Sequence, residues 1–239
     1  MRERWRPQQV LTPASGARLA DWRARLADAS PEDQAALAEE HAGLLLALLR
    51  RAGSACSSPR ERPLDAREAC RRLGQARVRL LLETHLLLIP ARTVPARTEL
   101  RVLALREAGA ALLARQDDAG PAEEPWGGQA ARTLLRLLEW VPRSLDTHDA
   151  AGAAGSMGPA SSWGERLLAL AGGEHWYHPA LIEGLRALAG REGDVRARRL
   201  GALLKAAIEE SGSARPVPAW SGDWPPQAAG PAGRGGLHG

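Results

Sequence analysis

The sequence predicts an all-α protein, and three observations carry this prediction. Ala, Leu, Arg and Glu dominate the 239 residues and β-branched residues are few. No stretch alternates polar and apolar residues as a half-buried strand does. Helix start and stop signals recur along the chain. We expect a compact multi-helix bundle over residues 12–210, with an N-terminal extension (1–11) before it and a disordered tail (211–239) after it.

The helices of the first half are marked by their caps. Residues 30–33 (Ser-Pro-Glu-Asp) combine an N-cap, a proline in the first turn and acidic residues. Asp65 with Glu68 predicts the start of another helix, which Gly74 ends in the left-handed conformation before the next helix, 75–89. Apolar residues on both sides of this turn are expected in the core: Leu73, Val78, Leu81 and Leu82.

The second half of the sequence also contains helix start and stop signals. Periodic apolar residues predict helices over 98–116, 126–140, 178–189 and 194–210. Small and polar residues over 143–161 predict a flexible loop. Ser162 with Glu165 resembles a capping box that opens another helix. Beyond Ser211, Pro and Gly dominate, which predicts the disordered tail.

Composition limits the function classes. The formal net charge of +4 is modest and does not indicate a nucleic-acid partner. No apolar run approaches the ~18 residues that span a bilayer. The two cysteines, Cys56 and Cys70, form no metal-binding pattern and suit a reducing cytoplasm, with a disulfide between them as an open alternative. We expect a soluble cytoplasmic protein.

The densest basic stretch runs from Arg50 to Arg79 and supplies the candidate binding residues. Arg67, Arg71 and Arg72 lie close together on one predicted helix, where residues i and i+4 share a face, and Arg79 follows on the next helix. Guanidinium groups on one face can bind a phosphate or nucleotide bidentately. The competing interpretation is a solvated helix surface. Because no aromatic residues interleave this face, sequence-specific nucleic-acid binding is not expected.

A pair of histidines offers a weaker candidate. His175 and His178 are three residues apart and could share a helix face, with Glu174 or Glu183 as a third metal ligand. Pro179 instead places His178 at a helix start, which favours turn capping and aromatic packing. No phosphate-cradling loop or nucleophile motif is present, so no cofactor is expected.

Residues 41–82 carry the most specific pattern. Residues 41–56 read H-A-G-L-L-L-A-L-L-R-R-A-G-S-A-C, and residues 63–82 read P-L-D-A-R-E-A-C-R-R-L-G-Q-A-R-V-R-L-L-L. This pattern resembles the HDOD family, bacterial signalling modules derived from metal-dependent HD phosphohydrolases. Gly53 stands where Asn is usual. The residues that match the family's two phrases are Leu48, Leu49, Arg50, Ala52, Ser54 and Ala55, then Pro63, Ala69, Leu73, Gly74, Val78, Arg79 and Leu81.

The resemblance implies a regulatory protein without catalysis. It extends more loosely over 12–210 and implies a helical fold that acts through a protein partner. Carried over to this sequence, the first metal-binding His of HD enzymes falls at Arg106, and the last Asp falls near Glu209 or Glu210. The His-Asp pair should lie within 133–140, which contains neither residue. The resemblance thus predicts a non-catalytic module with no metal and no cofactor.

Two alternatives stay open. A divergent HD-type phosphohydrolase could use the one literal His-Asp pair, His148-Asp149, with His85 and Asp194 as further ligands, because a hydrolytic metal needs imidazole and carboxylate donors. Against this, the pair falls in the predicted loop, and His85 is expected at the core edge, hydrogen-bonded to backbone. The other alternative is a basic helical adaptor that binds a nucleotide or nucleic acid through 50–79.

Overall fold

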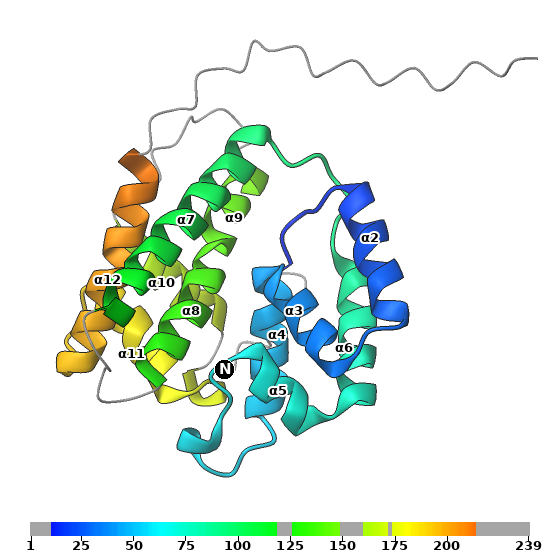
Figure 1. Cartoon of the computed structure of the whole chain (residues 1–239), viewed down its shortest axis with the longest axis horizontal. Helices are drawn as coiled ribbons and strands as arrows, with labels where there is room; N and C mark the ends of the chain where they lie inside the picture. The colour runs from blue at the N-terminus through cyan, green and yellow to red at the C-terminus, as the bar shows by residue number, and fades with distance from the viewer. Residues whose placement is uncertain (1–10, 119–125, 149–159, 172–173, 214–239) are drawn as a thin grey trace, which may run out of the picture.

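The computed structural model describes residues 11–118, 126–148, 160–171 and 174–213, and these ranges consist of helices joined by loops and turns, with one isolated bridge between Ala14 and Ala91. This confirms the predicted all-α class (Figure 1). The helices are α2 (Gly16–Ala27), α3 (Pro31–Glu39), α4 (Ala42–Gly53), η1 (Pro59–Glu61), α5 (Ala66–Leu73), α6 (Gln75–Leu88), α7 (Ala96–Asp118), α8 (Trp126–Leu138), α9 (Trp140–His148), α10 (Ala160–Ala171), η2 (Glu174–Trp176), α11 (Pro179–Leu188) and α12 (Val195–Ser213).

The helices form two groups that share one core. Figure 1 shows α2 to α6 on one side of the molecule and α7 to α12 on the other. The apolar helix α4 is buried along most of its length and packs against α8, which also contacts α7, α11 and α12. Each group centres on a fully buried tryptophan, Trp22 in the first and Trp163 in the second, within a single hydrophobic cluster. Burial of this shared apolar surface is the main force that holds the groups together.

The predicted caps of the first group are confirmed. Ser30 accepts a hydrogen bond from the backbone of Asp33 at 3.1 Å, and the Asp33 carboxylate accepts one from the Ser30 backbone at 3.1 Å. Asp65 caps α5 by accepting a hydrogen bond from the backbone of Glu68 at 2.7 Å. Each cap satisfies an N–H group that the helix itself cannot pair. These interactions span three residues, so the sequence contains all that is needed to predict them.

Gly74 makes the turn between α5 and α6. Its φ is 78° and its ψ is 150°. The positive φ was predicted, but ψ differs from that of the left-handed helical region, and the combination is one that only glycine adopts without strain. Three of the four apolar residues predicted to be in the core, Leu73, Val78 and Leu82, are buried, whereas Leu81 is half-buried.

Gly53 lets the end of α4 meet the second group. A Cβ atom built on Gly53 would lie 1.9 Å from the carbonyl oxygen of Trp176 in η2. One turn earlier, Arg50 donates to the carbonyl of Ala171 at 2.7 Å, and its guanidinium lies 5.6 Å from the centre of the Trp176 ring. This position, where the HDOD phrase has Asn, therefore has no room for a side chain.

Helix α9 was not predicted. The stretch 126–140 forms α8 and the start of α9, which continues to His148, so residues 143–148 of the predicted loop are helical. A proline in a helix interior ends the helix, which fits the predicted end at 140, but Pro142 lies in the first turn of α9, where its missing N–H group costs nothing. The rest of the predicted loop up to residue 159 lies outside the described residues.

Two further boundaries differ from the prediction. Helix α10 begins at Ala160, so Ser162 lies inside the helix rather than at its cap. Helix α12 reaches Ser213, so the start of the predicted tail is helical, and residues 214–239 lie outside the described part of the chain.

The cysteines are not paired, and no membrane-spanning helix is found. Cys56 and Cys70 are free thiols, which excludes the disulfide between them. Burial raises the pKa of Cys70 to about 12, and the nearby charge of Asp65 acts in the same direction. Among the described helices, none is long and apolar enough to cross a bilayer.

Candidate functional site

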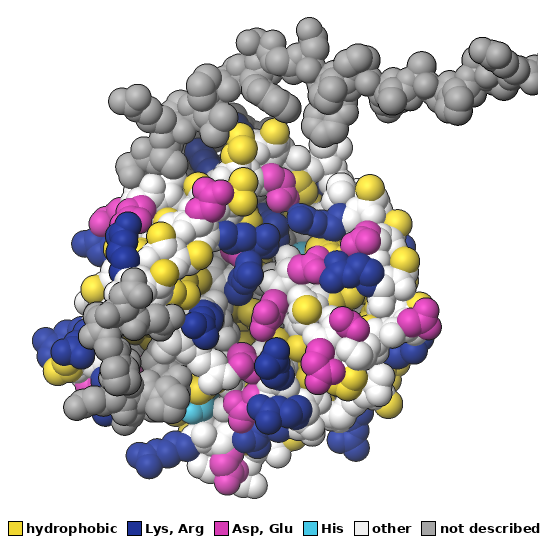
Figure 2. All heavy atoms as spheres, viewed as in Figure 1, with side chains coloured by type: hydrophobic (Ala, Val, Ile, Leu, Met, Phe, Trp, Pro, Cys, Tyr) yellow, Lys and Arg dark blue, Asp and Glu magenta, His cyan; other side chains and the backbone are white. Residues whose placement is uncertain are grey.

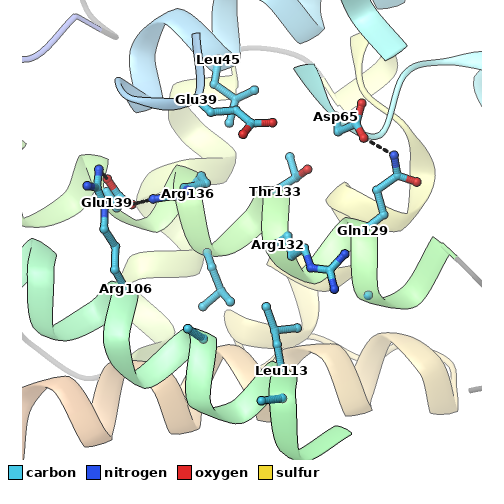
Figure 3. Close-up of a pocket in the computed structure, with 14 residues that line it drawn as sticks. Glu39, Leu45, Asp65, Arg106, Leu113, Gln129, Arg132, Thr133, Arg136 and Glu139 are labelled. Atoms are coloured by element: carbon cyan, nitrogen blue, oxygen red, sulfur yellow. Dashed lines mark hydrogen bonds and ion pairs between the residues drawn. The ribbon is translucent and has the colours of Figure 1, made fainter. Parts of the chain in front are cut away.

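A groove runs along α8, between α7 on one side and α3 to α5 on the other (Figure 3). Its volume is about 960 Å³, at the upper end of the ~300–1,000 Å³ range of ligand sites. Charged side chains of both signs line it: Glu39, Asp65, Arg106, Arg132, Arg136 and Glu139. The groove brings together helices that are far apart in the sequence, and for this reason it is the strongest candidate for a binding site.

Two arginines hold the buried carboxylate of Glu139 at one end of the groove. Glu139 is only 1% exposed and lies between α8 and α9. Arg106 of α7 donates to its two carboxylate oxygens at 2.7 and 2.6 Å, and Arg136 donates at 3.1 Å. The hydrogen bonds to Glu139 raise the pKa of Arg106, so the guanidinium stays charged. Bidentate, charge-assisted bonds of this kind are among the strongest that side chains make.

Asp65 and Gln129 close the other end of the groove. One oxygen of Asp65 caps α5, and the other accepts a hydrogen bond from the amide of Gln129 on α8. The two groups of helices are therefore tied together at this end by a side chain that also fixes the start of a helix. With both oxygens occupied, the Asp65 carboxylate is held in place facing the groove (Figure 3).

Two polar groups between these ends have no hydrogen-bond partner among the described residues. Glu39 is half-buried at the end of α3, and Thr133 of α8 is 5% exposed. In Figure 3 the Thr133 hydroxyl points from α8 toward the space between Glu39 and Asp65. Burial raises the pKa of Glu39, and the charge of Asp65 adds to this effect, while the guanidinium of Arg136 opposes it. Unpaired polar groups in such a partly desolvated place favour a ligand that pairs with them.

The chemistry available here is binding of a charged partner. Within the described ranges, no group of three or more His, Cys, Asp or Glu side chains is placed to hold a metal ion. The groove offers carboxylates on one wall and guanidinium groups on α8, and its apolar lining comes from Leu45, Leu113 and Leu135. This combination suits a ligand that carries both charge and apolar surface.

The predicted arginine face is exposed but partly neutralised. All four of its residues lie at the surface of α5 and α6: Arg67, Arg71, Arg72 and Arg79. Arg72 pairs with Glu68 at 3.0 Å, and Arg79 pairs with Glu83 at 2.8 Å, both one helical turn apart. Figure 2 shows one face of the molecule, on which basic and acidic side chains are interspersed rather than gathered by sign. The role of this face in anion binding stays a prediction.

The alternative metal ligands are not brought together. His85 on α6 places Nδ1 2.8 Å from a carbonyl oxygen one turn earlier, as expected for a core-edge histidine. Asp194 caps α12 with a hydrogen bond of 2.7 Å. Figure 1 shows α6 and α12 at opposite edges of the molecule, so His85 and Asp194 cannot share one ion at bond lengths of ~2.0–2.2 Å. His148 ends α9, and Asp149 lies outside the described residues.

The second histidine pair has structural roles. His178 caps α11, because its Nδ1 accepts a hydrogen bond from the backbone of Ala180 at 3.1 Å. His175 is exposed, and its ring centre lies 4.3 Å from that of Trp176. Turn capping and aromatic contact therefore account for both residues, as the position of Pro179 indicated.

Comparisons with protein-family models, with curated proteins and with solved structures found no significant match to this chain. The HDOD resemblance therefore remains a prediction from the motifs of residues 41–82.

Sequence reasoning missed the groove itself. The resemblance pointed to Arg106 and to 133–140 only as places where metal ligands are lost. One signal was present: Glu139 is a single acid between residues 134–138, which are four leucines and Arg136, and the apolar pair 140–141. An acid in the middle of such a stretch must be buried, and a buried carboxylate requires a cationic or hydrogen-bonding partner. Arg136 lies three residues before Glu139, but the second partner, Arg106, is identified only by the fold.

Proposed function

We propose that this chain is a non-catalytic, HDOD-like regulatory module, which acts in the cytoplasm through contacts with a protein partner in a signalling pathway. The motifs of residues 41–82 support the family, and the free thiols of Cys56 and Cys70 suit a reducing compartment. The mixed-charge groove along α8 offers a surface on which such a partner can bind.

The ion pair of Arg106 and Glu139 carries the proposal. By the resemblance, the first metal-binding His falls at Arg106, and the His-Asp pair falls in the stretch that contains Glu139. These two positions lie in contact, as they would in a metal site, but a guanidinium donates to a carboxylate there. A guanidinium has no lone pair to offer a metal and is always charged. A fixed internal cation therefore takes the place that a metal ion would need.

A metal and activity assay on the purified full chain tests the loss of catalysis. We expect substoichiometric Mn, Fe and Zn, and no hydrolysis of bis(p-nitrophenyl) phosphate above the buffer rate when these metals are added. His148→Ala should behave as the unmodified chain. A stoichiometric metal that disappears in His148→Ala, together with hydrolysis, would overturn the proposal in favour of the phosphohydrolase alternative.

Chemical crosslinking in cells tests the protein contact. The full chain and a Thr133→Arg variant, which fills the groove with a cationic side chain, are compared under the same conditions. We expect a crosslinked partner that is lost with Thr133→Arg and kept with Glu192→Gln, a change in the exposed turn before α12. A crosslinking pattern that is identical for all three chains argues against partner binding in the groove.

A further inference from the structure

We propose that the groove along α8 is a binding site for an extended, arginine-bearing peptide segment, and that residues 1–10 of this chain are its occupant. The inference deepens the proposed function, on which it rests for the view that the groove is a protein-contact site. It names the chemistry that the groove recognises. A partner that binds in the groove would then have to displace this segment.

One wall of the groove carries hydrogen-bond acceptors and negative charge that suit a cationic group. Glu39 has no hydrogen-bond partner among the described residues, although it is half-buried, and Thr133 is 5% exposed with its hydroxyl directed into the same space (Figure 3). The fixed carboxylate of Asp65 adds negative charge beside them. A guanidinium placed here would supply donors to the Glu39 carboxylate and the Thr133 hydroxyl, and the charge of the Asp65 carboxylate, whose two oxygens are already paired, would attract it.

The opposite wall has a different character. Ala110, Leu113 and Ala114 of α7 give it an apolar surface of mostly small residues, and Arg132 lies beside them on α8. Small side chains allow another backbone to come close. An occupant of this groove should therefore present cations toward α3 and α5, and an acid and apolar surface toward α7 and α8.

Residues 1–10 lie outside the described part of the chain, and their sequence, M-R-E-R-W-R-P-Q-Q-V, has this two-sided pattern. In an extended segment, successive side chains point to opposite sides. The proline at position 7 favours an extended conformation for the residue before it. One edge then carries Arg2, Arg4 and Arg6, and the other carries Glu3 and Trp5. The arginine edge complements Glu39 and Asp65, and the other edge complements the wall of α7 and α8.

The segment is attached close to the groove. Leu11 is 5% exposed, and Thr12 is anchored through its hydroxyl and carbonyl oxygens, which lie 3.2 and 3.0 Å from Nε2 of His41. His41 is only two residues after Glu39 in the loop between α3 and α4. Ten extended residues span up to about 35 Å, so the groove is well within reach.

A peptide titration on the full chain tests this assignment. The probe is the peptide MRERWRPQQV, blocked at both ends and labelled with fluorescein, and its binding is followed by fluorescence anisotropy at about 150 mM salt, where weak surface attraction is screened. The acceptor is a full-chain variant with Arg2, Arg4 and Arg6 changed to Ala. We expect it to bind the probe at least tenfold more tightly than the unmodified chain, whose own segment competes.

Matched variants show whether the probe enters the groove. In the triple-Ala background, Glu39→Gln or Thr133→Val should weaken binding at least fivefold, whereas Glu192→Gln should leave it unchanged. A probe whose arginines are replaced by Gln should not bind. Equal binding to the unmodified and triple-Ala chains, no binding to either, or binding that Glu39→Gln does not change would each overturn the inference.

The proposed function fails by a different route. Stoichiometric metal and hydrolysis in the assay above would overturn the regulatory module whatever the peptide does. A chain that is metal-free and inactive, but does not bind the probe, leaves that proposal standing and removes only the occupant proposed here.

Discussion

Two groups of arginines in this protein differ in how deeply the carboxylates that they pair with are buried. On the surface of α5 and α6, Arg72 and Arg79 pair with glutamates one turn away, and both partners of each pair are accessible to water. In the groove, Arg106 pairs with Glu139 across 33 positions of sequence, and the carboxylate is 1% exposed. Exposed pairs contribute about 0.2–1 kcal/mol, whereas breaking a buried pair costs about 3–5 kcal/mol. A stretch of sequence that is dense in charged residues is therefore not where the ion pair that contributes most to stability is found.

The largest expected effect comes from Arg106→Leu. It leaves the Glu139 carboxylate buried with Arg136 as its one remaining arginine, so we expect a loss of about 3 kcal/mol in the free energy of unfolding, measured by urea denaturation. Arg79→Leu, the matched change on the exposed face, should cost under about 0.5 kcal/mol. Equal costs for these two variants would remove the contrast between the arginine groups.

A double variant sharpens this test. Arg106→Leu with Glu139→Leu removes both charges, and two apolar residues fill much of the same volume. Because the cost of the single change lies in the stranded carboxylate, the double variant should be more stable than Arg106→Leu alone. A double variant that is less stable than the single one would show that the side-chain packing of Glu139, rather than its charge, matters at this end of the groove.

The contrast between buried and exposed groups should also appear in pH dependence. His41 is 1% exposed, and its Nδ1 accepts hydrogen bonds from the backbone of Gly43 and Leu44 at 3.1 and 3.3 Å. Burial lowers the pKa of His41 to about 4, and the nearby charge of Arg143 acts in the same direction. The unfolded chain takes up a proton near pH 6.5, and the folded chain does so only near pH 4. Stability is therefore lost as pH falls through this window.

By about pH 5 this loss should reach about 2 kcal/mol, compared with pH 7.5. Urea denaturation at both values measures it. His41→Gln should lower stability at neutral pH but weaken the dependence on pH. His175→Gln, at an exposed histidine in η2, should leave the dependence as it is. If His41→Gln retains the full dependence, another group is responsible for it.

The third effect concerns the turn that joins the two helices of the arginine face. Gly74→Val places a β-branched side chain at a φ of 78°, which should cost about 1–2 kcal/mol although the space around it is open. Gly128→Ala in α8 is the control. It also meets open space, but within a regular helix, so it should stabilise by up to about 1 kcal/mol.

The parts of the fold that sequence predicted are those in which cause and effect lie within one turn. Ser30 and Asp65 cap their helices as predicted, through residues three positions away, and Gly74 ends α5 with the predicted positive φ but a different ψ. Helix α9 was missed because Pro142 ends a helix in its interior but is tolerated in a first turn. The sequence is compatible both with a helix that ends before Pro142 and with a new helix that has Pro142 in its first turn. The packing of α9 against α7 and α8 decides in favour of the new helix.

The groove could not be predicted in the same way. Asp65 was identified as a cap, but its second oxygen pairs with Gln129, 64 positions away. Glu139 has one partner three positions away, Arg136, but Arg106, which donates to both of its oxygens, lies 33 positions away. Each of these pairs is chosen by which helices meet, and many other charged residues in an Arg-rich chain could have served. The sequence therefore identifies residues that need a partner, while the fold selects the partner.

The smallest expected effect tests the exposed face directly. Arg79→Gln removes an i, i+4 pair with Glu83 that is 2.8 Å long but about half exposed on both sides. We expect a loss of about 0.3–0.5 kcal/mol at low salt. At about 1 M NaCl the Debye length falls to about 3 Å, so the difference from the unmodified chain should vanish. Arg106→Leu should keep most of its cost in the same salt, because the Glu139 carboxylate is 1% exposed and salt screens a buried charge much less. A large, salt-insensitive cost for Arg79→Gln would mean that this arginine also has a buried role, and the two groups would then no longer differ in kind.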